Sequence, residues 1–258
     1  MWRRIAQSLQ GSSHAADDSP CQDSFSLRVL GDEANHTFLA CVADGAGSAE
    51  HSEVGSAIVC NTIVECAEAF LVAGGQLENL ARQDVLRWCA EARARIEREA
   101  SGFNCEVREL ASTLCAAIVA PTRSCFFQIG DGAMILRRSG VYGVVFWPQS
   151  GEYANSTNFL TSHHLDSQLE FLSIDAACND IALMTDGLER LALRFDSQTP
   201  HEPFFDPFFR ALRATDDFTG LNDALQTFLG SQPVRERSDD DKTLILASFI
   251  ADTTEDAV

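Results

Sequence analysis

The sequence lacks several patterns that assign a function directly. It has no GxGxxG segment between a strand and a helix and no P-loop, so it does not resemble a kinase. The spacing of an EF-hand loop is absent around Asp44. The nine cysteines include no CxxC pair, which speaks against a zinc ribbon or a thioredoxin-type redox motif.

Long apolar runs and a leader-like start are also missing. No apolar stretch reaches the roughly 18 residues that span a bilayer. The first residues, MWRRIAQSLQGSSH, are too polar for a signal peptide. Cysteines lie inside apolar runs, such as Cys41 in FLACVA and Cys125 in SCFFQI, which is typical of small buried residues in a reducing compartment. We therefore expect a soluble, cytoplasmic protein.

Basic residues are scarce. The chain has 19 Lys and Arg against 38 Asp and Glu, and its formal net charge is -19. This balance disfavours nonspecific binding to nucleic acid and docking on an anionic membrane, so neither partner is expected. Acidity is compatible with cation binding, but by itself it indicates only solubility.

The length and composition describe an ordinary globular chain. The 258 residues fit one large domain or two small ones, and 45% hydrophobic and 22% charged residues are usual values. No internal repeat or low-complexity linker divides the chain. We expect a single domain over 1–258.

Hydrophobic patterning predicts alternating blocks of helices and strands. Helical spacing covers 52–73, where Ser52 is a candidate cap and Gly74-Gly75 a stop, and a second helix is expected over about 76–100. Further helices are expected over 204–214 and 221–229. Strand-like runs are 38–43, 112–119, 124–129, 133–137, 141–146, 169–174, 181–184 and 243–250.

Short turns between these strands favour antiparallel pairing. Asp131-Gly132 and Ser139-Gly140 are both good hairpin dipeptides. The resulting fold class is α+β, a sandwich of mainly antiparallel sheets with α-helices packed outside them.

Three apolar strands end in the same dipeptide, Asp-Gly. The segments are FLACVADG, CFFQIGDG and DIALMTDG, which end at Asp44, Asp131 and Asp186, and a fourth acidic cluster at 239–241 precedes the last strand. Any one of them alone is typical of a plain turn or a solvated loop. Carboxylates that converge at one sheet edge repel each other unless cations neutralise them, and hard oxygen ligands favour Mg²⁺ or Mn²⁺. The four together indicate a possible metal site.

Six segments, in order, resemble the motifs of the PP2C family of metal-dependent protein phosphatases, and the first is similar to the Cys-Gln-Asp variant of its bacterial branch. They span residues 11 to about 250 and read GSSHAADDSPCQDSF, VADGAGS, ASTLCAAIV, IGDGAMIL, LMTDGLER and DDKTLILA. Each segment is weak alone, whereas six in the family's order are specific. The resemblance implies a PP2C-like β-sandwich and a serine/threonine protein phosphatase, which is a phosphoric monoester hydrolase.

The resemblance also implies a set of metal ligands. Asp44 would bridge two Mn²⁺ or Mg²⁺ ions, the Gly45 carbonyl would bind the second ion, and Asp186 and Asp240 would complete the first. Asp240 is preferred to Asp241 because Asp240 stands first in the match to D-N-x-T. Asp131 matches a position associated with a third, weaker ion.

Residues around the ligands are assigned in the same way. Asp23 would hydrogen-bond metal-bound water, and Gln22, where many members have Glu, can orient water without adding charge. His14 is nearest to the position where many members have a phosphate-binding Arg, and its alternative role is a surface-loop histidine.

Other positions depart from the family pattern. Ala46 stands where some members have His, and Arg190 where a further Asp is frequent, which weakens a third metal site unless Glu189 contributes. The segment 151–161 corresponds to a variable flap, where Asn155 and Thr157 could shape substrate access or simply lie in a polar loop. Adjacent histidines such as His163-His164 rarely bind one ion together.

The implied mechanism is in-line attack on phosphorus by a hydroxide that bridges two ions. Cys21 lies in the first motif, but the Cys-x5-Arg loop of cysteine phosphatases would need Arg at 27, where the chain has Leu27. The substrate would be a phosphorylated protein, and a cognate Ser/Thr kinase system would be a further partner. Two alternatives stay open: a non-catalytic, partner-binding relative and a phosphatase for a small phosphorylated metabolite.

Overall fold

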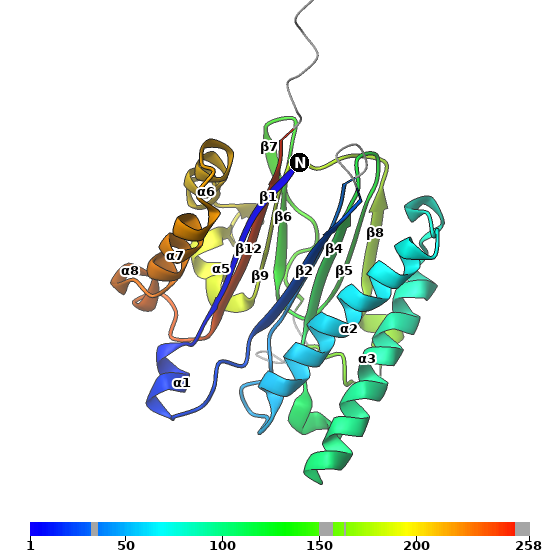
Figure 1. Ribbon diagram of the computed structural model, residues 1–258. Helices are drawn as coiled ribbons and strands as arrows, with labels where there is room; N and C mark the ends of the chain where they lie inside the picture. The colour runs from blue at the N-terminus through cyan, green and yellow to red at the C-terminus, as the bar shows by residue number, and fades with distance from the viewer. Residues whose placement is uncertain (32–35, 150–156, 163, 251–258) are drawn as a thin grey trace, which may run out of the picture.

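The computed structural model describes residues 1–31, 36–149, 157–162 and 164–250. Two five-stranded sheets lie face to face, and helices cover their outer faces (Figure 1). This arrangement confirms the predicted α+β sandwich of antiparallel sheets flanked by helices.

Both sheets are antiparallel between every pair of neighbouring strands. The first sheet has the order β1 (Trp2–Leu9), β12 (Lys242–Phe249), β9 (Asp180–Met184), β6 (Ala133–Arg138) and β7 (Val141–Val144). The second has the order β2 (Ser24–Leu30), β3 (Thr37–Ala43), β4 (Leu114–Val119), β5 (Ser124–Ile129) and β8 (Glu170–Ile174). A two-stranded ribbon pairs β10 (Leu193–Arg194) with β11 (Thr199–Pro200).

The longer helices form the outer layers. The second sheet is covered by α2 (Ser52–Val72) and α3 (Arg82–Phe103), and the first by α6 (Glu202–Ala214) and α7 (Phe218–Leu229) (Figure 1). Shorter elements connect them: α1 (Ser12–Ala16), α4 (Leu165–Gln168), α5 (Glu189–Ala192), α8 (Gln232–Arg235) and the 3₁₀ turns η1 (Leu77–Asn79), η2 (Val107–Leu110) and η3 (Asp186–Leu188).

Each inner strand contributes to two cores. In β3, Phe38 and Val42 face the core between the sheets, whereas Leu39 and Cys41 face α2 and α3. Side chains alternate between the faces of a strand, so a strand covered on both sides must be apolar at every position. This double burial explains the uninterrupted apolar run FLACVA, and it also explains why Cys41 and Cys125 are fully buried.

One predicted hairpin is wrong and one is confirmed. Asp131-Gly132 does not join paired strands, because β5 belongs to the second sheet and β6 to the first. Gly130, at φ +104°, helps the chain cross between the sheets, and a Cβ there would lie 2.7 Å from Thr113 Cγ2. Ser139-Gly140 does form a two-residue hairpin between β6 and β7, with both residues at positive φ.

Several predicted boundaries shift. Ser52 is the first residue of α2 and not its cap, and the second helix begins at Arg82, after the separate turn η1. The edge strands β1 and β2 were not predicted. Gly74, at φ +86°, follows the end of α2 as expected.

Helix α2 also contradicts one expectation. Its 21 residues are long and apolar enough to cross a membrane by length and composition alone. Within the fold, however, Val59 and Ile63 are buried in the core against the second sheet and α3. The helix is apolar because one side of it packs against the second sheet and α3.

Candidate metal centre

Three aspartates converge where strands of both sheets end. Asp44 follows β3, Asp131 follows β5 and Asp186 follows β9. One carboxylate oxygen of each lies within 4.8 Å of those of the other two, and all three residues are partly buried. The crossing of the chain at Gly130 brings Asp131 of the second sheet to Asp186 of the first. The shared Asp-Gly pattern therefore marks one cluster.

Backbone contacts fix Asp44 in this cluster. Its N–H donates to Thr113 Oγ1 at 2.9 Å, and the Thr113 N–H donates to the Asp44 carbonyl at 2.8 Å. The Gly45 N–H donates to the Gln22 carbonyl at 3.1 Å, and a Cβ at Gly45 would lie 2.7 Å from Ser52 Cβ. Backbone hydrogen bonds thus join the segment VADGAGS to ASTLCAAIV, through Asp44 and Thr113, and to the first motif, through Gly45 and Gln22. Metal binding by the Gly45 carbonyl stays a prediction.

Asp23 lies deeper, beneath the cluster. Its Oδ2 accepts a hydrogen bond from Thr185 Oγ1 at 2.7 Å, and Thr185 Oγ1 in turn accepts the Thr243 N–H at 2.9 Å. Its Oδ1 is buried without a partner, as is the side-chain Oε1 of Gln22. Both residues predicted to orient water therefore have an acceptor that is not satisfied by the described protein atoms.

Asp241 connects the first motif to the last one, a role that the sequence did not predict. Its Oδ1 accepts the Gly11 N–H and its Oδ2 accepts the Gln22 N–H, each at 2.6 Å. His14 Nδ1 lies 2.9 Å from Asp241 Oδ1. His14, the predicted phosphate contact, thus has one nitrogen next to a carboxylate. The available signal was Asp241 itself, which occupies the Asn position of D-N-x-T.

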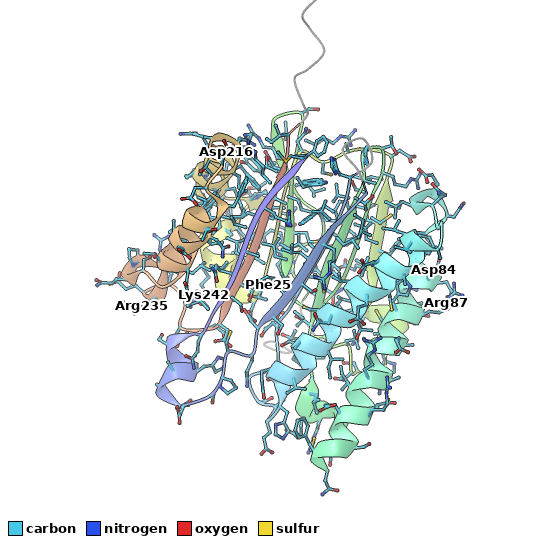
Figure 2. The ribbon with its side chains drawn as sticks, in the orientation of Figure 1. Phe25, Asp84, Arg87, Asp216, Arg235 and Lys242 are labelled. Carbon is cyan, nitrogen blue, oxygen red and sulfur yellow. The ribbon has the colours of Figure 1, made fainter. Side chains whose placement is uncertain are left out.

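Asp240 lies beside this cluster but not within its 4.8 Å group. It lines a hollow together with Asp186, and its Oδ1 accepts the N–H of Asp241 at 2.8 Å. The buried ammonium of Lys242 donates to the Asp240 carbonyl. Figure 2 shows Lys242 at the beginning of β12. The structure thus groups Asp131 with Asp44 and Asp186 more closely than it does Asp240.

A loop residue contacts Asp131. Thr157 Oγ1 donates to Asp131 Oδ2 at 2.5 Å, while Asp131 Oδ1 is buried without a partner. Thr157, a residue of the predicted flap, thus contacts the cluster. Asn155 and His163 lie outside the described residues. The His164 carbonyl accepts hydrogen bonds from Ser167, so this histidine helps to begin α4.

The departures from the family pattern lie around the cluster. Ala46 is buried beside Ala49 and Ala111. Arg190 is exposed on α5. Burial and the charge of Asp131 raise the pKa of the neighbouring Glu189. Burial also raises the pKa of Cys21 to about 12, which keeps its thiol protonated and agrees with the exclusion of a thiol mechanism.

Burial and mutual repulsion together disfavour the ionised form of the cluster. Burial raises the pKa of Asp44 well above its ordinary value, and the charges of Asp23 and Asp186 raise it further. Burial, together with the charges of Asp131 and Asp240, raises the pKa of Asp186 to about 8. Burial is also the main cause of the raised pKa of Asp23. Without cations, ionising these groups is costly.

The donor set fits Mg²⁺ or Mn²⁺. Every candidate side-chain ligand is a carboxylate oxygen, which hard cations prefer. The unpartnered Oδ1 of Asp131 can bind an ion, and the unpartnered Oδ1 of Asp23 and Oε1 of Gln22 can accept hydrogen bonds from its water ligands. Bound cations would also offset the repulsion between the carboxylates.

Comparisons with known proteins identify the family of the chain. The family model described as protein phosphatase 2C matches residues 10–230. Serine/threonine-protein phosphatase 3 of Escherichia coli (strain K12) is 36% identical over 251 residues, which is 95% of this chain and 98% of that protein.

Two solved structures share the fold. Serine/threonine phosphatase Stp1 from Staphylococcus aureus has a TM-score of 0.64 at 15% identity, and the match covers 97% of this chain and 96% of that one. The catalytic domain of PstP, in complex with two manganese ions, has a TM-score of 0.59 at 18% identity and covers 97% and 99%. The chain belongs to the protein phosphatase 2C family.

Proposed function

We propose that this chain is a metal-dependent serine/threonine protein phosphatase that binds two Mn²⁺ or Mg²⁺ ions. The observation that carries the proposal is the convergence of Asp44, Asp131 and Asp186 from strand ends of both sheets. The relative from E. coli is named a serine/threonine-protein phosphatase, and PstP was solved with two manganese ions. Both support this activity and cofactor.

The ligands follow from the cluster and the family motifs. Asp44 would bridge both ions, the Gly45 carbonyl would bind one, and Asp186 and Asp240 would bind the other. Asp240 can join because it lines the same hollow as Asp186. Asp131 would hold a weaker third ion.

When bound, the ions supply an activated water and neutralise charge on the phosphoryl oxygens. The chain's own residues position this chemistry. Asp23 is held by Thr185, and its Oδ1 has no partner among the described protein atoms, so it can accept a hydrogen bond from a water molecule. Gln22 offers Oε1 in the same way but adds no charge. Transfer of the phosphoryl group to water needs no covalent bond to the protein.

The substrate would be a phosphoserine or phosphothreonine residue of a protein. A Ser/Thr kinase must form that substrate, so a cognate kinase is a natural partner in the same compartment. We place both in the cytoplasm, which is reducing, because all nine cysteines are free and six of them are buried.

Dephosphorylation of a phosphothreonine peptide tests the proposal. We expect activity that depends on Mn²⁺ and falls at least ~100-fold in Asp44→Asn and Asp186→Asn, since each removes a charged ligand. Metal binding without turnover of any phosphoester would indicate a non-catalytic relative. Turnover of small phosphorylated metabolites but not of phosphopeptides would indicate a metabolite phosphatase.

A further inference from the structure

A hollow of about 170 Å³ adjoins the metal centre. Asp186 and Asp240, two of the proposed ligands, form part of its lining. Arg190 of α5 and Arg237, which follows α8, contribute to the same lining, together with Ser238. Two arginine residues thus line the same small space as the carboxylates that would hold the ions.

Glu189 and Asp239 also line the hollow, but neither arginine forms a close ion pair with a carboxylate of the described residues. Within the part of the chain that the structure describes, Arg190 and Arg237 take part in no ion pair within 4.0 Å. Arginines elsewhere do pair, such as Arg95 with Glu65 and Arg213 with Asp180. Both cations are exposed to solvent, so their N–H groups are available to an incoming anion.

The position of the hollow beside the metal centre indicates which anion would bind there. A group bound there lies next to Asp186 and Asp240 and hence beside the proposed ions. Guanidinium presents a planar fork of donors that matches phosphate oxygens. His14, the sequence candidate for this contact, has Nδ1 directed at Asp241.

We propose that Arg190 and Arg237 form an anion subsite that holds the phosphoryl group of the substrate beside the metal centre. The inference rests on the proposed phosphatase function and adds the residues that recognise the phosphoryl group. It predicts that binding of free phosphate, the product, depends on the same two side chains.

Kinetics with three substrates test the subsite. The substrates are p-nitrophenyl phosphate, a phosphothreonine peptide with neutral flanks and one with acidic flanks. In Arg190→Ala and Arg237→Ala we expect KM to rise about tenfold or more for all three, which is the usual scale for one charged hydrogen bond. Lys at either position should recover part of the loss. The matched control is Arg235→Ala, since Arg235 lies exposed on α8 outside this lining (Figure 2) and should leave KM unchanged.

Calorimetry supplies a readout that does not depend on turnover. Binding of inorganic phosphate in the presence of Mn²⁺ should weaken about tenfold in both Ala variants, while Mn²⁺ affinity should stay that of the wild type. If the wild type bound phosphate without hydrolysing any ester, the phosphatase proposal would fail and the subsite would stand.

Three results would overturn the subsite. Unchanged KM and unchanged phosphate binding in both variants would mean that the arginines are only surface charges. A KM increase confined to the acidic peptide would assign them to a flanking carboxylate. A parallel loss of Mn²⁺ affinity would assign them a structural role.

Discussion

Asp241 Oδ2 accepts the backbone N–H of Gln22 at 2.6 Å, which joins residues 219 positions apart in the sequence. The other oxygen of the same carboxylate accepts the N–H of Gly11, so each carboxylate oxygen accepts one backbone N–H group of the first motif. One carboxylate thereby holds the first motif against the last.

Asp241→Asn tests this link. An amide has one oxygen, so one of the two N–H groups would face an NH₂ group and stay unpaired. We expect a loss of about 1–3 kcal/mol in the free energy of unfolding, the usual cost of a buried unsatisfied donor. Chemical denaturation measures it, with Asp239→Asn as the control because the Asp239 side chain is exposed. Equal stability of the two variants would contradict the role of Asp241.

The titration of His14 reports on the same carboxylate. Burial lowers the pKa of His14, but the Asp241 contact and the charges of Asp241, Asp240 and Asp23 outweigh it, so the pKa lies above the ordinary 6.5. The protonated form is favoured in the folded state. Its contribution to stability is therefore present below pH 6.5 and is lost as pH rises through the folded pKa.

NMR titration of the histidine ring protons measures this shift. We expect the His14 pKa to fall in Asp241→Asn, in which the neutral amide no longer favours the imidazolium. A pKa that is the same in both proteins would show that Asp241 does not control His14.

Removing a repelling carboxylate should stabilise the metal-free protein. The pKa of Asp186 is raised from 3.8 to about 8, so the folded state holds a proton that the unfolded state releases. Metal-free stability then falls as pH rises from about 4 through about 8. At pH 8, Asp186→Asn should raise the Tm without metal by about 2–4 °C, which is the scale of roughly 1 kcal/mol at this size.

Thermal unfolding with and without Mn²⁺ distinguishes the loss of repulsion at Asp186 from a general change in stability. Wild type should gain stability when Mn²⁺ is added, and Asp186→Asn should gain much less. Asp216→Asn is the matched control, because Asp216 is exposed at the opposite end of the molecule (Figure 2). A metal-free Asp186→Asn protein less stable than wild type would contradict the repulsion.

Gly187 is required by a close backbone approach. A Cβ at this position would lie 1.9 Å from the Asp241 carbonyl oxygen. Gly187→Ala must therefore displace the turn that carries Asp240 and Asp241. We expect a stability loss of about 1–3 kcal/mol, as for other overpacked sites, and weaker Mn²⁺ binding.

Gly102→Ala is the control for that substitution. Nothing lies within 4 Å of the added Cβ, and alanine favours the helix α3. In calorimetry, Gly102→Ala should bind Mn²⁺ with the affinity of the wild type, and Gly187→Ala should bind it more weakly. Equal affinities would mean that the turn tolerates the shift.

Most inner elements of the fold were predictable because they are buried on both faces. Strands such as β3 and β4 consist of almost continuous apolar runs, which are typical of buried strands. The edge strands β1 and β2 were missed because each has a partly exposed face with polar residues, such as Arg4 and Arg28. The Asp131-Gly132 turn was misread because a dipeptide does not specify which sheet the next strand joins.

The site was predictable only in part. Asp44, Asp131 and Asp186 follow strands that could be recognised, so their convergence could be anticipated. The role of Asp241 could not, because it depends on backbone N–H groups from the opposite end of the chain. The one signal in the sequence was the position of Asp241 in the match to D-N-x-T, and that match does not name the backbone groups that Asp241 contacts.

A crystal grown with Mn²⁺ and examined by anomalous scattering tests the central claim most directly. We predict two strong peaks within about 2.0–2.3 Å of carboxylate oxygens, with Asp44 contacting both ions and Asp186 one of them. Peaks elsewhere, or none beside Asp44 at saturating Mn²⁺, would contradict the proposed metal centre.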